Sequence, residues 1–200
     1  MDSSNAVIRF WNFLKEDTWQ SWIVSLILIV IGIKYVLFPL LTLITGSALP
    51  LVVVESCSMY HGTDFDSWWN SNEGWYNNYK NITREKFEDF NFKNGLNKGD
   101  IILTLSGKNI KKGDIIIFHS NSKYPIIHRI ISTSPLQTKG DNNDDQLRGY
   151  NNQAGVDETN IQEEQIISRA KIRIPYLGWA KLIFFEPKRP KDQRGLCKTH

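Results

Sequence analysis

The most hydrophobic part of the chain is one long run near its N-terminus, WIVSLILIVIGIKYVLFPLLTLITG at 22–46. A helix of this length measures about 37 Å, which is enough to cross a bilayer. Lys34 interrupts the run at a cost of about 2.5–3.5 kcal/mol, but its long side chain can extend toward the headgroups. Pro39 kinks such a helix without ending it. We therefore predict a transmembrane helix at 22–46, with a buried core helix as the alternative.

The segment before this run, 1–21, predicts a short amphipathic helix on the cytoplasmic side. Its apolar residues recur at the spacing of one helical face: Val7, Phe10, Trp11 and Leu14. Arg9 and Lys15 precede the span, whereas no Lys or Arg occurs between Lys34 and Lys80. The positive-inside bias then places the N-terminus in the cytoplasm and the residues after the span on the outer face of the cell membrane.

Beyond the span, the pattern changes to short β-branched runs separated by turns, which predict a β-rich domain at 47–187. The expected strands are LPLVVVE (49–55), KGDIILTL (98–105), KGDIIIFH (112–119), PIIHRIIST (125–133) and EQIISRAKIRI (164–174). A polar loop, 138–160, separates the last two. The segment 174–185, IPYLGWAKLIFF, is too short to span a membrane and predicts strand-and-turn or interfacial structure. A basic tail, 188–200, follows and is expected to be mobile.

An aromatic, Asn-rich insertion at 62–97 interrupts this β-rich pattern. Only 83–90 has a helical pattern. Its large rings either enter the lipid interface or cover the domain's own core, and the sequence supports both equally: Phe65, Trp68, Trp69 and Trp75.

Composition narrows the function classes. The 200 residues suit one compact domain plus an accessory segment, and the net charge of +3 gives no reason to expect nucleic acid. The two cysteines, Cys57 and Cys197, lack the spacing of a zinc site, and no cofactor is implied. A disulfide between them is the less favoured expectation, because Cys197 lies in the tail.

Candidate catalytic chemistry begins with a serine, which is a poor nucleophile until a base takes its proton. The possible bases are the four histidines: His61, His119, His128 and His200. His128 and Arg129 form a polar pair inside the apolar strand at 125–133. Neighbours in a strand point to opposite faces, so we expect at most one of the two to lie against the core. A satisfied histidine on an edge strand is the alternative to a catalytic one.

Five motifs in one order resemble the signal peptidase I family, in its archaeal and endoplasmic-reticulum branch. With the N-terminal span they cover most of the chain apart from the insertion. The matching segments are Ser56-Cys57-Ser58-Met59, Gly113-Asp114-Ile115-Ile116, His128-Arg129, Thr138-Lys139-Gly140-Asp141-Asn142-Asn143 and Ile174-Pro175-Tyr176-Leu177-Gly178.

The resemblance implies a mainly β catalytic domain, a signal-peptidase-like barrel or sandwich, on a single transmembrane helix. It implies Ser58 as the nucleophile and His128 as the base, where bacterial relatives carry lysine. It implies two acidic residues as well. Asp141 matches the first. The spacer before the second is missing here, so Asp145 is the choice and Asp144 the close competitor.

Met59 and His61, which follow the nucleophile in the sequence, are candidate substrate contacts. The family often has proline where this chain has His61, so shaping the turn is the alternative role for that histidine. A thiolate of Cys57 is a rival nucleophile, but a buried and inert Cys57 is favoured, because only one of Cys57 and Ser58 can face His128 in a strand.

The expected function is a membrane-anchored serine endopeptidase that removes N-terminal signal peptides from exported preproteins. Its expected partners are these signal peptides, the lipid bilayer and the protein translocation channel. The alternative is a non-catalytic, membrane-tethered β-domain that acts as a scaffold or adaptor, which the missing spacer before Asp145 favours. A self-cleaving repressor of related fold fits poorly, because the span stands in place of DNA-binding helices and histidine holds the base position.

Overall fold

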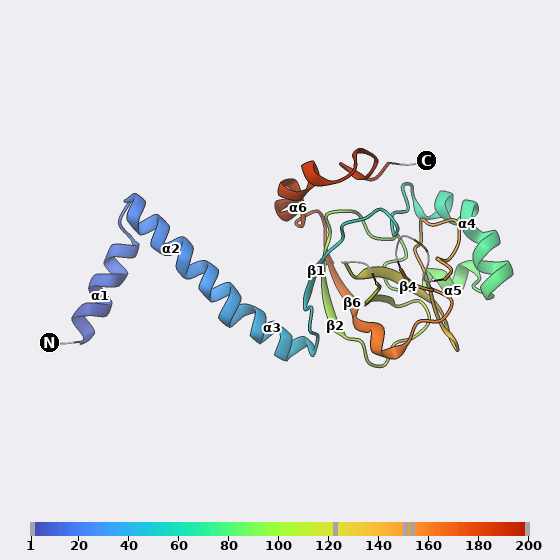
Figure 1. The fold of residues 1–200 in the computed structure, drawn as a ribbon, viewed down its shortest axis with the longest axis horizontal. Coiled ribbons are helices and arrows are strands. Elements are labelled where there is room, and N and C mark those ends of the chain that lie inside the picture. The colour runs from blue at the N-terminus through green and yellow to red at the C-terminus, as the bar shows by residue number, and fades with distance from the viewer. Residues whose placement is uncertain (1–2, 122–123, 150–151, 153–154, 199–200) are drawn as a thin grey trace. The chain divides into compact units, whose positions relative to one another are not determined.

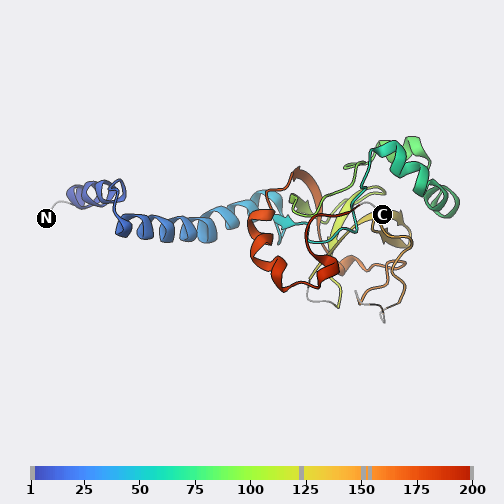
Figure 2. The same ribbon diagram turned by 90° about the horizontal axis from the view of Figure 1, so that it is seen from above.

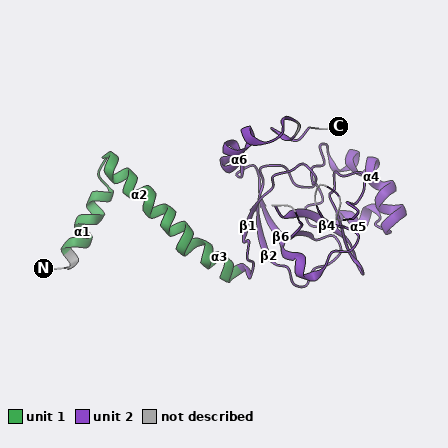
Figure 3. Ribbon diagram, viewed as in Figure 1, with its two compact units in different colours: residues 1–44 green, residues 45–200 purple. Residues whose placement is uncertain are grey.

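The computed structural model describes residues 3–121, 124–149, 152 and 155–198 (Figure 1). The chain divides into two compact units, Met1–Ile44 and Thr45–His200 (Figure 3). The division falls close to the predicted end of the span at residue 46.

The first unit is helical. Helix α1 covers Ser3–Leu14, as the amphipathic pattern predicts, and α2 covers Trp19–Gly32. The Thr18 hydroxyl caps α2 by accepting a hydrogen bond from the Ser21 N–H, at 3.3 Å. A π-helical turn (Ile33–Leu37) and α3 (Phe38–Thr45) continue the same helix. The stretch Trp19–Thr45 is long and apolar enough to cross a membrane.

The π-helical turn explains how this helix passes Pro39. Proline lacks an N–H and its ring collides with the carbonyl one turn earlier. Just before it, the Phe38 N–H donates to the carbonyl of Ile33, five residues back, which widens the turn. The proline therefore modifies the helix locally and does not end it, as the sequence predicts.

The second unit contains one antiparallel sheet in the order β1-β2-β6-β3-β4-β5, curled into a half-barrel. The strands are β1 (Leu51–Val53), β2 (Ile101–Ser106), β3 (Ile115–Phe118), β4 (Ile126–Thr133), β5 (Leu136–Lys139) and β6 (Ile166–Ile174). Each of the five predicted strand segments overlaps one of these strands, whereas β5 lacks an apolar run and was not predicted. The predicted fold class is confirmed only in part, because the unit is mixed α/β around a single curled sheet.

The insertion is largely helical. Helix α4 (Phe65–Lys80) and α5 (Arg84–Glu88) lie on the side of the second unit away from β1 and α6 in both views (Figures 1 and 2). Asp64 caps α4 by accepting from the Ser67 N–H at 3.0 Å. Trp68 and Trp69 are buried in a cluster that includes Ile131 of β4, so they cover the protein's own core. The alternative prediction, that they enter lipid, is wrong.

Both members of the His128-Arg129 pair in β4 are buried. His128 is 3% exposed and Arg129 0%, so the prediction that at most one lies against the core is wrong. Strand β4 is an inner strand, and both of its faces are covered. Ile131, on the Arg129 face, packs against the insertion, and Ile130, on the His128 face, packs in a cluster with Val156 and Ile161.

The C-terminal region is also ordered onto the second unit. Helix α6 (Trp179–Phe185) follows β6, so the predicted strand-and-turn structure for 174–185 is wrong in its second half. Two short 3-10 turns follow, at Glu186–Lys188 and Lys191–Gln193. A disulfide joins Cys57 to Cys197, with their Cα atoms 5.6 Å apart. The expectation of a mobile tail with an unpaired Cys197 is therefore wrong, because Cys197 is bonded to Cys57.

Candidate active site

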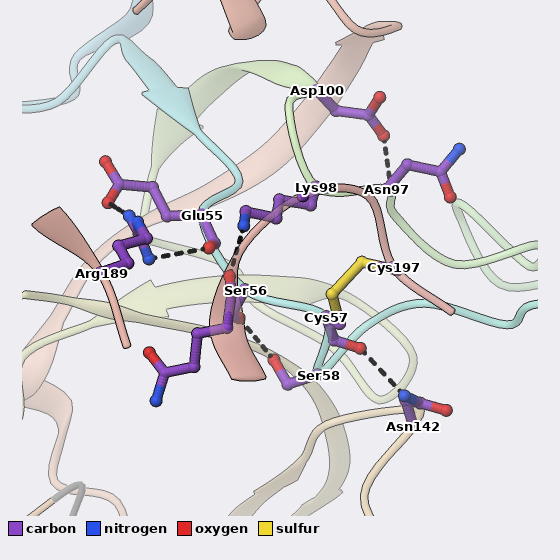
Figure 4. Close-up of a disulfide and its surroundings, with 12 residues drawn as sticks. Glu55, Ser56, Cys57, Ser58, Asn97, Lys98, Asp100, Asn142, Arg189 and Cys197 are labelled. Carbon is purple, nitrogen blue, oxygen red and sulfur yellow. Dashed lines mark hydrogen bonds and ion pairs between the residues drawn. A yellow bond between two sulfur atoms is a disulfide. The ribbon is translucent and has the colours of Figure 1, made fainter. Parts of the chain in front are cut away.

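Ser58 lies in a turn after β1, close to the disulfide (Figure 4). The half-buried Ser58 has its Oγ 3.1 Å from Ser56 Oγ. The 140–143 loop holds the turn from the other side, because the Asn142 N–H donates to the Ser58 carbonyl at 2.8 Å and Asn142 Nδ2 donates to the Cys57 carbonyl at 3.1 Å. Cys57 carries no free thiol, which removes the rival thiolate nucleophile.

The structure places His128 next to the 140–143 loop, which also contacts Ser58. A Cβ atom on Gly140 would lie 2.8 Å from His128 Nε2 and 2.8 Å from the Ser58 carbonyl oxygen. The ring nitrogen and the serine carbonyl oxygen therefore both lie close to this glycine, no farther apart than twice that distance. Among the described residues, no hydrogen bond joins Ser58 to His128. The serine hydroxyl is instead hydrogen-bonded to the Ser56 hydroxyl.

The carboxylate that contacts His128 is Glu158. Its Oε1 lies 2.5 Å from His128 Nδ1, and both side chains are buried. The Thr138 hydroxyl donates to Oε1 at 2.9 Å and the Leu147 N–H donates to Oε2 at 2.8 Å, so the carboxylate is held from three sides. An ionised carboxylate only accepts hydrogen bonds, which assigns the proton to Nδ1 and leaves Nε2 as the acceptor facing Gly140.

The second predicted acidic residue lies elsewhere. Asp145 is exposed and accepts hydrogen bonds from Trp75 Nε1 at 3.1 Å and Arg148 Nη2 at 3.3 Å. Its neighbour Asp144 is also exposed. The imidazole contact expected of Asp141 or Asp145 belongs to Glu158 in the structure.

Asp141 belongs to a buried cluster on the Arg129 side of β4. It pairs with Arg129 Nη2 at 2.7 Å, lies 3.0 Å from His61 Nε2 and accepts from the Tyr76 hydroxyl at 3.3 Å. Burial opposes its ionisation, but the Arg129 guanidinium and the hydrogen bonds from His61 and Arg129 hold the pKa of Asp141 far below its ordinary value. Arg129 also donates to the Phe92 carbonyl at 2.9 Å, so the cluster fastens the insertion to the sheet.

The two candidate substrate contacts are part of the core. Met59 is 1% exposed, and its sulfur accepts from the Asp141 N–H at 3.4 Å. His61 stacks on Trp68 with ring centroids 3.7 Å apart, and burial lowers its pKa below the ordinary value. Neither side chain is open to a substrate here, so the turn-shaping alternative describes His61 better.

Lys139 is a buried cation next to the Gly140 loop. Its Nζ donates to the Gly140 carbonyl at 3.1 Å and lies 4.9 Å from the centroid of the Trp75 ring. Burial lowers the pKa of Lys139 to about 8, against the opposing effect of carboxylates led by Asp141.

The remaining histidines and possible metal ligands lie outside this arrangement. His119 is exposed just beyond β3, and His200 lies outside the described residues. Within the part of the chain that the structure describes, no three His, Cys, Asp or Glu residues cluster in a way that could hold a metal ion.

Glu158 was missed because it lies in a polar segment without a recognisable motif. The structure shows Val156 and Glu158 both fully buried, although Glu158 lies in a turn. A comparison with protein-family models finds no match, and neither does a comparison with curated protein sequences.

Proposed function

We propose that the protein is a membrane-anchored serine endopeptidase of the signal peptidase I type, which removes N-terminal signal peptides from exported preproteins. One observation carries this proposal. Ser58 and His128 are seventy residues apart in the sequence, yet the Ser58 carbonyl oxygen and His128 Nε2 each lie 2.8 Å from the position that a Cβ atom on Gly140 would take, and a buried carboxylate backs the imidazole. The order of motifs around both residues supports the same family.

In the proposed mechanism, a small rotation of the Ser58 side chain exchanges its hydrogen bond to Ser56 for one to His128 Nε2. The imidazole takes the hydroxyl proton while Oγ attacks the scissile carbonyl carbon. His128 then donates this proton to the leaving amine, which yields an acyl-enzyme on Ser58. Water, deprotonated by the same nitrogen, hydrolyses the ester and restores the serine.

Glu158 takes the supporting role that the resemblance assigns to an aspartate. It fixes the ring with Nδ1 protonated and stabilises the imidazolium that forms during attack. Two hydrogen bonds from Thr138 and Leu147 keep it in place. Asp141 acts at a distance, by holding Arg129 and the insertion.

The oxyanion requires donors next to the nucleophile. The Ser56 hydroxyl, 3.1 Å from Ser58 Oγ, is the nearest side-chain donor among the described residues. We assign it to the oxyanion together with the Ser58 backbone N–H.

The proposed location is the outer face of the cell membrane, with the helix Trp19–Thr45 as the anchor and the N-terminus in the cytoplasm. The Cys57–Cys197 disulfide favours an oxidising compartment for the second unit. Signal peptides emerging from the translocation channel would then meet Ser58 on this face of the membrane.

The test is cleavage of a preprotein by the full chain in lipid nanodiscs. The wild type is expected to release the mature protein, whereas Ser58→Ala and His128→Ala are expected to release none above background. His119→Ala changes an exposed histidine and serves as the matched control, with the wild-type rate expected. Cleavage that persists in Ser58→Ala would refute the proposal.

The non-catalytic adaptor remains the second candidate, since Ser58 bonds to Ser56 rather than to His128 in this structure. Under that alternative, the wild type would release no product at any pH or preprotein concentration, while still binding a partner of the export machinery.

A further inference from the structure

A cavity of about 580 Å³ lies beside the candidate nucleophile, and the proposed mechanism does not use it. Its walls come from four parts of the second unit: Tyr60 after the nucleophile, Asn97 and Lys98 before β2, Tyr176 and Trp179 around the start of α6, and Gly195, Leu196 and Cys197 of the tail. A volume of this size is in the range typical of small-ligand sites and leaves ample room for one large side chain.

Two walls of the cavity lie close to Ser58 in space. Tyr60 is two residues after Ser58. Cys197 Cα lies 5.6 Å from Cys57 Cα, and Cys57 is about 3.8 Å from Ser58 along the chain. The tail wall is therefore within about 10 Å of the nucleophile's Cα, the length of about three residues of extended peptide. Figure 4 shows the disulfide and Ser58 side by side.

The chemistry of the walls is apolar. Asn97 Nδ2 donates to the Tyr176 hydroxyl at 2.9 Å, and Trp179 Nε1 donates to the Lys98 carbonyl at 3.1 Å, so these polar groups already have partners. Most of the surface left for a ligand is ring surface and the side chain of Leu196, which is 63% exposed. Exposed apolar surface in a cavity next to a reaction centre favours an apolar ligand group.

The cavity is also held in shape before any ligand binds. Buried Asp100 accepts from the Asn97 N–H at 2.7 Å and from the Tyr176 N–H at 3.1 Å, which fixes two walls. Lys98 Nζ donates to the Gln193 carbonyl at 2.7 Å and pairs with Glu186, which fixes the tail. The disulfide adds a covalent link at Cys197.

We propose that this cavity binds one large aromatic or aliphatic side chain of the polypeptide that is cleaved, at a position within three residues of the scissile bond. The inference rests on the proposed function and adds a specificity determinant to it. Because the tail forms one wall, the disulfide is required for this preference and not for the chemistry at Ser58.

The test uses the full chain carrying Ser58→Ala in nanodiscs, so that peptides bind without being cut. Short dye-labelled peptides span the cleavage junction of a secreted preprotein, and phenylalanine replaces alanine at one position at a time, from three residues before the scissile bond to three after it. Fluorescence anisotropy measures the dissociation constant. At one position, phenylalanine is expected to tighten binding by at least about tenfold.

Variants of the walls then identify the cavity. Leu196→Ser and the double change Cys57→Ser with Cys197→Ser are expected to remove most of this gain, because one loses an apolar contact and the other releases the tail. Phe184→Ala alters a side chain on α6 that is 75% exposed and does not line the cavity, so the gain should persist.

The inference would be overturned by equal affinities for alanine and phenylalanine at every position, or by a gain that Leu196→Ser leaves intact. A gain of equal size at all positions would indicate general adsorption and would also refute it. Cleavage by the wild type is measured separately. Position-specific binding without any cleavage would support the cavity and contradict the peptidase, whereas cleavage without a position-specific gain would contradict only the cavity.

Discussion

Glu158 Oε1 lies 2.5 Å from His128 Nδ1, with both side chains buried between β4 and the 156–161 segment. This contact orients the imidazole toward Gly140, the glycine that Ser58 also approaches. It also shows that the acidic partner of the histidine comes from a part of the chain without any family motif.

Glu158→Gln is expected to lower kcat by about 10²–10⁴-fold with little change in KM, because a neutral amide neither fixes the ring tautomer nor stabilises the imidazolium. Preprotein cleavage kinetics measure this loss. Asp145→Asn is the matched control and should cleave at the wild-type rate, since Asp145 is exposed and away from His128. A large loss in Asp145→Asn with none in Glu158→Gln would restore the role to Asp145.

The general outline of the fold could be predicted from the sequence because it follows from local patterns. Runs of isoleucine after Gly-Asp turns mark β2 and β3, and the hydrophobic run marks the long N-terminal helix. Helix α4 was missed although its buried rings at 68, 69 and 76 follow helical spacing, because the polar, Asn-rich composition of the insertion obscures that pattern.

The candidate site was predictable only where a motif carried it. Ser58 and His128 stand in recognisable segments, whereas Glu158 reaches the imidazole through a tertiary contact that no local pattern encodes. The burial of His128 and Arg129 together was unpredictable for a related reason. The second face of β4 is covered by the insertion, whose packing depends on side chains far away in sequence.

Gly140→Ala is expected to lower the cleavage rate by at least about 100-fold. The added Cβ would lie 2.8 Å from both His128 Nε2 and the Ser58 carbonyl, closer than such atoms can approach, so it must push the two apart. The matched control is Gly74→Ala in α4, where an added Cβ has no atom within 4 Å. Wild-type cleavage by Gly140→Ala would mean that the two residues need not meet at this glycine.

Asp141→Asn is expected to destabilise the fold rather than the chemistry. It leaves the fully buried Arg129 without its counter-charge, which costs about 3–5 kcal/mol. Urea unfolding followed by tryptophan fluorescence measures the loss, and kcat per folded molecule should stay close to that of the wild type. A normal free energy of unfolding together with a strongly reduced kcat would assign Asp141 a catalytic role.

The free energy of unfolding is expected to rise between pH 8 and pH 10.5 through Lys139. In the folded protein, burial lowers the pKa of this lysine to about 8, whereas the unfolded chain keeps it protonated to about pH 10.4. The unfolded state then binds more protons, so stability increases with pH by up to about 3 kcal/mol. Lys139→Met should remove this rise, and Lys108→Met, which alters an exposed lysine, should keep it. Identical pH profiles for Lys139→Met and the wild type would contradict the assignment.

The central claim is that Ser58 and His128 act as one unit, and a double-mutant cycle on preprotein cleavage tests it most directly. Rates are measured in nanodiscs for Ser58→Ala, His128→Ala and the double variant. If the hydroxyl and the imidazole share one proton transfer, either single change removes the whole contribution and the double variant is no slower than the singles. Losses that multiply in the double variant, or a Ser58→Ala rate equal to that of the wild type, would contradict the claim.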